Sequence, residues 1–381
     1  MLRLAIIGAS YLQMPLINKA KEMGYETHVF AWECGDVGES AADVFHPISI
    51  VEKERILEEC RKLDVAGICS IASDLAMLTV NYVATEMGLI SNAWSDTCFS
   101  TNKIDMIRRF KEFGVPAPDF VVVSGVDEVD TKNLTYPLIV KPSDRSGSRG
   151  ITRLNDPDQG LKEAIDKAID QSFEKRALIE QYIGGHEYSV ECISYEGQHT
   201  MLSVTRKFTT GDPHYIETGH LEPAPLEESV VDDIRKYVFS ALDSLNIRFG
   251  ASHSELKIDG GKIYFIEIGG RMGGDRIGSD LVFLSTGYDF VKAVIDVAVG
   301  NKPDTFNPPD RKHYAAIRYL FNDDDLKVYQ TLQKTHPDLI YSGEISEERG
   351  DITDSSTRWG HFIMRTEDMS VIEGYLPSDK I

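Results

Sequence analysis

The chain has 381 residues, a length that favours two or three packed lobes with separate hydrophobic cores. Its 40 basic and 61 acidic residues give a formal net charge of -21, which would repel the phosphates of a nucleic acid. No apolar stretch approaches the roughly 18 residues that span a bilayer, and the segment MLRLAIIGAS lacks the parts of a signal peptide. The five cysteines contain no CxxC pair, which favours a reducing setting. We therefore expect a cytoplasmic protein that binds neither nucleic acid nor membrane.

Residues 1–100 alternate between predicted strands and helices. Strands are expected at residues 2–8, 26–32 and 65–73, and helices at residues 13–23 and 52–63. The strands are almost entirely apolar, which is typical of a parallel sheet covered by helices on both faces. Gly8 and Ser10 follow the first strand, where a turn can approach a phosphate, but the incomplete GxGxxG pattern disfavours a bound NAD.

Residues 101–300 are predicted to form a second region, of α+β character, in which antiparallel strands dominate. A helix at residues 102–113 precedes two prolines that mark a domain boundary. Further strands are expected at residues 136–142, 176–183, 187–194 and 199–208, further helices at 157–172 and 230–245, and a long loop up to residue 226. Gly260 and Gly261 form a two-residue turn signal and predict a hairpin.

Beyond residue 300, a proline-rich connector at residues 301–311 separates the second region from strands expected at residues 314–321 and 360–366. This segment is predicted to be a small C-terminal subdomain, residues 301–381. The fold class expected for the whole chain is therefore α/β in its first lobe and α+β in the rest.

The segment YPLIVKPSDRSGSRGI places Lys141 at the end of a strand, beside a loop rich in glycine, serine and arginine. Such a loop can cover a triphosphate, because glycines let backbone N–H groups approach phosphate oxygens. The order of residues differs from that of a P-loop, and a solvated hairpin loop is the simple alternative.

Two further segments carry carboxylates. In ALIEQYIGGHEYSVE, the strand end at Glu180 and the later Glu187 can contact adenine and ribose, or can be an acidic strand end before a Gly-Gly turn. In the hairpin, Glu255 and Glu267 are expected nearly opposite each other on one face. A Mg²⁺ ion held between them would relieve their repulsion, whereas two independently solvated side chains are the alternative. Arg271 follows closely and can balance phosphoryl charge.

Taken in order, these motifs resemble the ATP-grasp superfamily, and in particular the carboxylate–amine ligases related to biotin carboxylase, carbamoyl phosphate synthetase and L-amino-acid ligases. The resemblance covers roughly residues 1–300. It implies a first domain at 1–100, and an ATP-grasp domain at 101–300 with a smaller ATP-binding lobe (101–190) and a larger metal-binding lobe (191–300).

The resemblance also implies roles for single residues. ATP contacts are expected from Lys103, Lys141, the loop residues Ser146, Gly147 and Ser148, Glu180 at the adenine amino group, backbone at Tyr182 and Ile183, and Glu187 at ribose. Glu255 and Glu267 would hold Mg²⁺, or Mn²⁺ in its place, and Arg271 would steady an acyl phosphate. Where many family members have E-I-N-P-R, this chain has Gly269 in place of the asparagine. The number of metal ions, one or two, therefore stays open.

The function that the resemblance implies is that of an ADP-forming ligase, which activates a small carboxylate, such as an amino acid, as an acyl phosphate for an amine. Arg206, Lys207 and His214 are candidate substrate contacts, and only one of the first two can face the site, since they are neighbours on a strand. An ATP-grasp kinase, a carboxyphosphate-forming enzyme and a non-catalytic ATP-binding regulator are the alternatives. The sequence leaves open an amide or a thioester product, and the resemblance is compatible with a homodimer.

Overall fold

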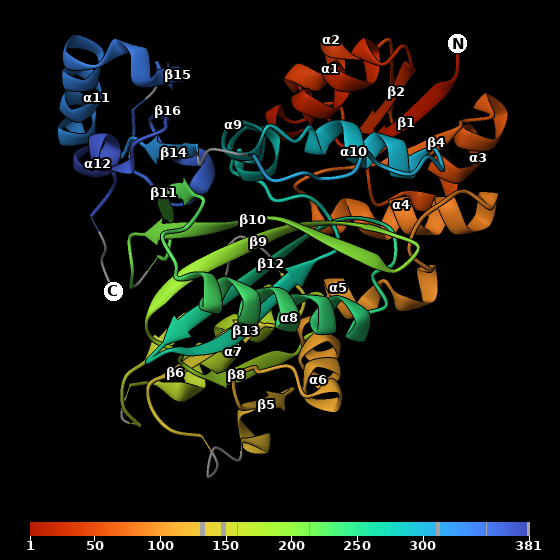
Figure 1. Cartoon of the computed structure of the whole chain (residues 1–381). Helices are drawn as coiled ribbons and strands as arrows, with labels where there is room; N and C mark the ends of the chain where they lie inside the picture. Colours follow the sequence, from red (N-terminus) through yellow and green to blue (C-terminus); the bar gives the residue numbers. More distant parts are fainter. Residues whose placement is uncertain are drawn as a thin grey trace.

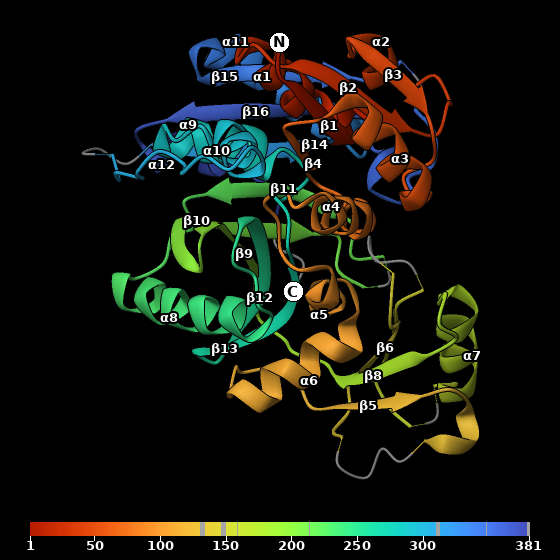
Figure 2. The same ribbon diagram turned by 90° about the vertical axis from the view of Figure 1, so that its right-hand side faces the viewer.

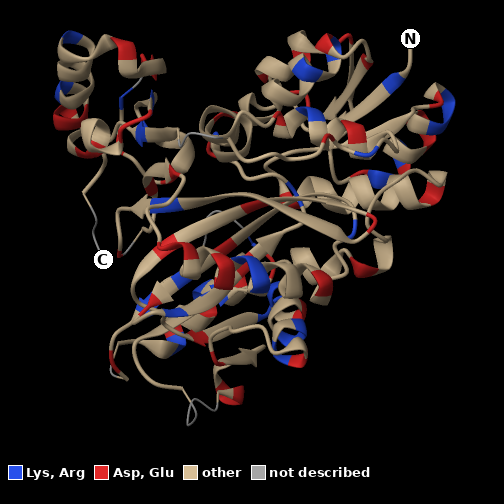
Figure 3. Ribbon diagram, in the orientation of Figure 1, with Lys and Arg blue, Asp and Glu red and all other residues tan. Residues whose placement is uncertain are grey.

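The strands of this protein form three sheets, seen here in a computed structural model that describes residues 1–129, 134–145, 150–157, 159–212, 214–309, 313–347 and 349–378. A parallel sheet near the N-terminus and a small antiparallel sheet lie at opposite ends of the molecule, with a long antiparallel sheet between them (Figures 1 and 2). Acidic residues occur in all three parts (Figure 3), so the net charge of -21 does not come from one acidic segment.

The first lobe has a parallel sheet with strand order β3-β2-β1-β4. Its strands are β1 (Arg3–Ile7), β2 (Glu26–Ala31), β3 (Val44–Pro47) and β4 (Gly67–Cys69), and its helices are α1 (Met14–Glu22), α2 (Val37–Ala41), α3 (Lys53–Leu63) and α4 (Asp74–Met87). Alternate side chains of β1 enter two cores: Leu4 and Ile6 pack with α1 and α10 (Phe290–Ala298), and Ala5 and Ile7 pack with α3 and α4. The prediction of a parallel α/β lobe is confirmed.

The small sheet is antiparallel and has the order β5-β8-β6-β7. It contains β5 (Phe120–Val123), β6 (Leu138–Pro142), β7 (Thr152–Leu154) and β8 (Ala177–Gln181), and α7 (Leu161–Gln171) covers one of its faces. On that face Ile165 and Ala168 of the helix pack against Val140 and Ile179 of the strands. The opposite face of the small sheet borders a cleft.

The long sheet has the order β13-β12-β9-β10-β11-β14-β16-β15 and is antiparallel throughout. Its strands are β9 (His186–Tyr195), β10 (Gln198–Thr209), β11 (Glu217–Glu222), β12 (Gly250–Asp259), β13 (Lys262–Gly269), β14 (Tyr314–Tyr319), β15 (Ile340–Ile345) and β16 (Gly360–Thr366). The prediction of one long loop up to residue 226 is wrong, because β11 lies within it and pairs with both β10 and β14. The C-terminal strands therefore continue this sheet.

The remaining helices pack against the long sheet or lie next to it in the chain. They are α5 (Cys98–Thr101), α6 (Lys103–Phe113), α8 (Glu228–Ser244), α9 (Val282–Thr286), α11 (Asp323–Thr335) and α12 (Met369–Ile372). Helices α6 and α8 share a core with β9, β12 and β13, and α11 packs on β14 and β16. Among the described residues, no helix is both long enough and apolar enough to cross a bilayer.

The connection from β8 to β9 passes very close to the end of β12. Gly185 has a φ of +73°, and a Cβ atom there would lie 2.0 Å from the carbonyl oxygen of Ile258. Its neighbour Gly184 has a φ outside the left-handed region, and the atoms nearest to a Cβ there would belong to the Asp259 side chain, the closest at 3.3 Å. The backbone at Gly185 therefore allows no side chain, whereas the backbone at Gly184 does.

Gly185→Ala should lower the free energy of unfolding by roughly 2 kcal/mol or more, because the alanine would be strained and would collide with backbone. Gly184→Ala is the matched control and should change it by less than half as much. Chemical unfolding of both variants measures the difference, and equal losses would contradict the close approach seen at Gly185.

Glu222 is a carboxylate buried in the core at the end of β11. Thr205 Oγ1 donates a 2.6 Å hydrogen bond to its Oε2, and Ser285 Oγ donates a 2.7 Å hydrogen bond to its Oε1. Burial raises the pKa of Glu222 to about 7, despite these hydrogen bonds. The folded protein therefore keeps a proton that the unfolded chain has released between pH 4.5 and about 7.

Because the folded pKa is the higher one, the contribution of Glu222 to stability falls as pH rises through this window and is lowest above it. Glu222→Gln should raise the free energy of unfolding at pH 8 by roughly 3 kcal/mol and change it far less at pH 5. Urea unfolding at the two pH values, with the exposed Glu174→Gln as control, tests this. A gain that is the same at both pH values would contradict it.

Candidate functional site

A cleft lies between the small sheet and the edge of the long sheet that is formed by β12 and β13. It encloses about 1190 Å³ of space, part of it open to solvent. Strands β6 and β8 contribute residues from one side, and β10, β12 and β13 contribute residues from the other. The first residue of α4, Asp74, reaches it from the first lobe, so all three parts of the fold meet here.

Two lysines line the cleft from β6 and from the start of α6. Lys141 on β6 forms a 2.6 Å ion pair with Glu180 on the neighbouring β8, and both side chains are buried. Lys103 is the first residue of α6, whose N-terminus is capped by Asn102. Its ammonium group contacts the Glu267 carboxylate across the cleft. Burial opposes the charge of Lys103, but the Glu267 carboxylate outweighs burial and raises the pKa above its ordinary value.

The segment that joins the two sheets carries Tyr182, whose ring contacts two cations. The Arg153 guanidinium lies 4.0 Å from the centre of the Tyr182 ring, and the Lys257 ammonium lies 4.9 Å from it. Lys257 Nζ also donates a 3.2 Å hydrogen bond to the carbonyl oxygen of Ile183. These contacts fix the backbone of the joining segment at the rim of the cleft.

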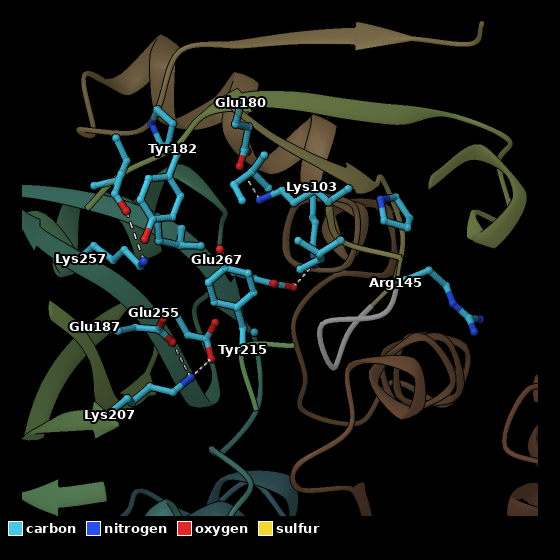
Figure 4. Close-up of a pocket in the computed structure, with 18 of the residues that line it drawn as sticks. Lys103, Arg145, Glu180, Tyr182, Glu187, Lys207, Tyr215, Glu255, Lys257 and Glu267 are labelled. Carbon is cyan, nitrogen blue, oxygen red and sulfur yellow. Dashed lines mark hydrogen bonds and ion pairs between the residues drawn. The ribbon is translucent and has the colours of Figure 1, made fainter. Parts of the chain in front are cut away.

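Lys207 on β10 lies at the centre of an acidic cluster (Figure 4). Its Nζ is 2.6 Å from Glu255, 2.9 Å from Glu187 and 3.8 Å from Glu217. Burial disfavours the charged lysine, but the surrounding carboxylates outweigh burial and raise the pKa of Lys207 well above its ordinary value. The lysine is therefore a fixed counterion that allows three carboxylates to stand together.

Glu255 receives a second positive partner in His253. The ring Nε2 of His253 lies 3.3 Å from Glu255 Oε1, and its Nδ1 contacts the buried Glu191. Burial would raise the pKa of Glu255, but Lys207 and His253 hold it well below its ordinary value. Glu255 is therefore a carboxylate anion in a partly buried site.

Glu255 and Glu267 face each other in the register of β12 and β13, as predicted from the hairpin. Both line the cleft, and each is paired with a lysine from another element. Two opposed carboxylates with further room beside them are a donor set that fits Mg²⁺, which takes one or two carboxylates and completes its shell with phosphates and water. Within the described part of the chain, no cluster of three or more His, Cys, Asp or Glu could hold a metal alone.

Arg271 lies just past the end of β13 and is held by a residue of the first lobe. Its Nε donates to Asp74 Oδ1 and its Nη2 donates to Asp74 Oδ2, each at 2.9 Å. Burial opposes the charge of Arg271, but Asp74 outweighs burial and raises the pKa further above its ordinary value. The guanidinium is thus a permanent cation in the cleft wall.

The structure brings most of the predicted residues to this one cleft. Those that line it are Lys103, Lys141, Glu180, Tyr182, Ile183, Glu187, Lys207, Glu255, Glu267 and Arg271. Arg206 lies outside the lining, with its Nη2 3.1 Å from His186 Nδ1, and His214 is exposed. Ser146, Gly147 and Ser148 lie outside the described residues.

Several lining residues were not predicted. They include Asp74, His253 and Lys257. The alternation of β12 could have revealed His253 and Lys257, because both point to the same face as Glu255. Nothing in the local sequence indicates Asp74, since its contact with Arg271 joins segments far apart in the chain.

Residues 134–280 match the sequence pattern of the family described as ATP-grasp domain. The chain contains an ATP-grasp domain. The matched residues run from just before β6 to beyond Arg271, so they supply Lys141, Glu180, Lys207 and both opposed glutamates. Lys103 and Asp74 precede them.

Relatives of known name support this assignment. A D-alanine–D-alanine ligase of Thermoanaerobacter sp. is 29% identical over 185 residues, 44% of this chain and 50% of its own length. One of Hydrogenovibrio crunogenus is 32% identical over 164 residues, 42% of this chain and 51% of its own length. The chain therefore spans about half the length of these curated relatives.

A solved structure extends the likeness of the fold beyond the ATP-grasp domain. The L-amino acid ligase from Bacillus licheniformis superposes with a TM-score of 0.81, at 23% identity, over 98% of this chain and 96% of that protein. The first lobe and the C-terminal strands thus belong to an arrangement shared with that ligase, which shows a common fold.

Lys207→Met should lower the free energy of unfolding at pH 7.5 by roughly 3 kcal/mol, because it leaves three partly buried carboxylates without their counterion. The loss should shrink at pH 5, where a carboxyl group can take up a proton instead. Arg206→Met is the matched control, since the adjacent residue faces away from the cleft, and its cost should be smaller by about 2 kcal/mol or more. Equal losses in urea unfolding would contradict the counterion role of Lys207.

Proposed function

We propose that this protein is an ADP-forming carboxylate–amine ligase, which joins a small carboxylate to an amine through an acyl phosphate. The observation that carries the proposal is the convergence of Lys103, Lys141, the Glu255–Glu267 pair and Arg271 on one cleft. In a chain that contains an ATP-grasp domain, these are the groups that phosphoryl transfer to a carboxylate requires.

The nucleotide is proposed to lie along the cleft from the joining segment to the opposed glutamates. The adenine ring would contact Glu180 and the backbone of Tyr182 and Ile183, and Glu187 would accept hydrogen bonds from ribose. Lys103 and Lys141 would contact the phosphates, since both are buried cations that line the cleft. The depth of the cleft would exclude bulk water from the triphosphate.

Glu255 and Glu267 would hold Mg²⁺, or Mn²⁺ in its place, between the two strands. The ion, when bound with the nucleotide, supplies positive charge to the phosphate oxygens. In its absence Lys103 and Lys207 balance the two carboxylates. Lys207 is therefore assigned as a counterion of the acidic cluster rather than as a receptor for the substrate carboxylate.

In the first step, an oxygen of the substrate carboxylate attacks the γ-phosphorus, the bond from that phosphorus to the bridging oxygen breaks, and ADP leaves. Lys103, Lys141 and Arg271 balance the negative charge that spreads over the transferred group. In the second step, the amine attacks the acyl carbon, the C–O bond to phosphate breaks, and the amine loses a proton. Arg271 stays charged throughout and stabilises the oxyanion and the departing phosphate.

Release of ADP and phosphate from Mg-ATP should require both a carboxylate and an amine. Pools of amino acids and other small carboxylates, each with and without amine acceptors, form the test panel. Glu267→Gln should lower the rate by about 100-fold or more, because it removes one charge of the metal-binding pair. The exposed Glu174→Gln should leave the rate unchanged.

The other outcomes separate the alternatives. A stable phosphorylated product formed without an amine would indicate a kinase-like or carboxyphosphate-forming enzyme. Binding of ATP with no release above the Glu267→Gln variant in any pool would favour an ATP-binding regulator. Failure to bind Mg-ATP, measured by calorimetry, would contradict the proposal as a whole.

A further inference from the structure

The loop that follows β4 carries a first-lobe residue into the cleft, and several contacts hold it there. Ser70 Oγ donates a 2.7 Å hydrogen bond to the Ile7 carbonyl oxygen, and Gln13 Nε2 donates one of 2.9 Å to the Ile71 carbonyl oxygen. Ala72 has a φ of +56°, in the left-handed region that a residue with a side chain rarely adopts. Its N–H group donates a 3.1 Å hydrogen bond to the carbonyl oxygen of Met272.

This strained turn places Asp74, two residues later, against Arg271. Backbone strain of this kind persists where the surrounding structure requires it, and it occurs often at functional sites. Asp74 and Arg271 are both mostly buried, with 16% and 15% of their side-chain surfaces exposed, and both line the cleft. Asp74 binds the guanidinium through Nε and Nη2, which leaves Nη1 for a group in the cleft.

The same ion pair fills the space beside Gly269. A Cβ atom at Gly269 would lie 2.6 Å from Asp74 Oδ1 and 3.0 Å from Arg271 Cζ and Nε. At the next residue, Gly270, a Cβ atom would meet nothing closer than Ser100 Oγ at 3.3 Å. The two adjacent glycines therefore differ, because only Gly269 is restricted by the ion pair.

The departure from the E-I-N-P-R pattern thus has a physical reason. An asparagine at position 269 could not coexist with Asp74 and Arg271 in their present places. Gly269, Asp74 and the orientation of Arg271 therefore depend on one another, although position 74 and positions 269–271 are far apart in the sequence.

We propose that Asp74, which belongs to the first lobe, is a positioning residue that holds the Arg271 guanidinium toward the reacting phosphoryl group. The ion pair occupies the space that a side chain at position 269 would otherwise fill. The inference deepens the proposed ligase function and rests on it for the role of Arg271. It makes the first lobe part of the active site, rather than only a neighbour of it.

The first part of the proposal, that Asp74 restricts the space beside Gly269, is tested by thermal unfolding. This test requires no enzymatic activity. Gly269→Ala should lower the melting temperature by several degrees more than the matched Gly270→Ala. In an Asp74→Ala background, the closest contact is removed and the Arg271 side chain is released from its partner, so this difference should disappear. If Gly269→Ala costs the same in both backgrounds, Asp74 does not restrict position 269 and the proposal is wrong.

The functional half is tested with the carboxylate and amine that support turnover of the wild-type protein. Asp74→Asn should lower kcat by about tenfold or more while the KM for ATP changes by less than about twofold, because the phosphate-binding lysines are untouched. Asp105→Asn is the control, since Asp105 also lies in the first turn of a helix but pairs with Arg108 on the surface.

An unchanged kcat in Asp74→Asn, or a loss shared equally with Asp105→Asn, would overturn the positioning role. If the wild-type protein shows no turnover with any substrate pair, the proposed ligase function fails instead. Thermal unfolding then decides the inference alone. If the difference between Gly269→Ala and Gly270→Ala disappears in the Asp74→Ala background, Asp74 is supported as the residue that fixes Arg271. If the losses from Asp74→Ala and Gly269→Ala are additive, that role is contradicted.

Discussion

The cleft depends on the balance of buried charge around two opposed glutamates. Glu255 and Glu267 face each other across neighbouring strands, where like charges repel. Lys103 reaches one from helix α6, and Lys207 reaches the other from β10, so each carboxylate is held by a cation from a separate element. Burial makes these pairs costly to break, because either partner alone would be an uncompensated charge. These pairs therefore hold the two carboxylates in place.

This constraint explains why three sheets meet at one place. The small sheet supplies Lys141 and Glu180, the long sheet supplies the opposed glutamates with Lys207, and the first lobe supplies Asp74 to hold Arg271. Cations and carboxylates line the cleft together, an arrangement that matches a nucleotide whose phosphates and metal ion need both. A chain with net charge -21 thereby keeps a cluster of lysines and arginines in its cleft.

Local patterns were sufficient to predict the groups that lie on regular strands. The Gly-Gly turn fixed the register that opposes Glu255 and Glu267, and strand alternation required that only one of Arg206 and Lys207 face the cleft. Strand β11 was missed, because ETGHLE follows a glycine- and proline-containing loop and carries polar residues on both faces. Helix α4 was missed because its apolar residues do not form one narrow stripe.

Contacts between distant segments could not be predicted from sequence. The Asp74–Arg271 pair and the Lys207–Glu217 contact depend on how the first lobe and β11 pack, and no local periodicity encodes that packing. The absence of asparagine at position 269 was visible in the sequence, but its cause became clear only from the space that Asp74 occupies.

The most direct test of the account follows oxygen from the substrate carboxylate. With a carboxylate labelled with ¹⁸O, the acyl-phosphate route breaks the C–O bond to phosphate in its second step, so one carboxylate oxygen must leave with the phosphate. Mass spectrometry of the released phosphate should therefore show one labelled oxygen per molecule. The amount of labelled phosphate should equal the amount of product formed. Phosphate that carries no label while the amide forms would contradict the proposed mechanism.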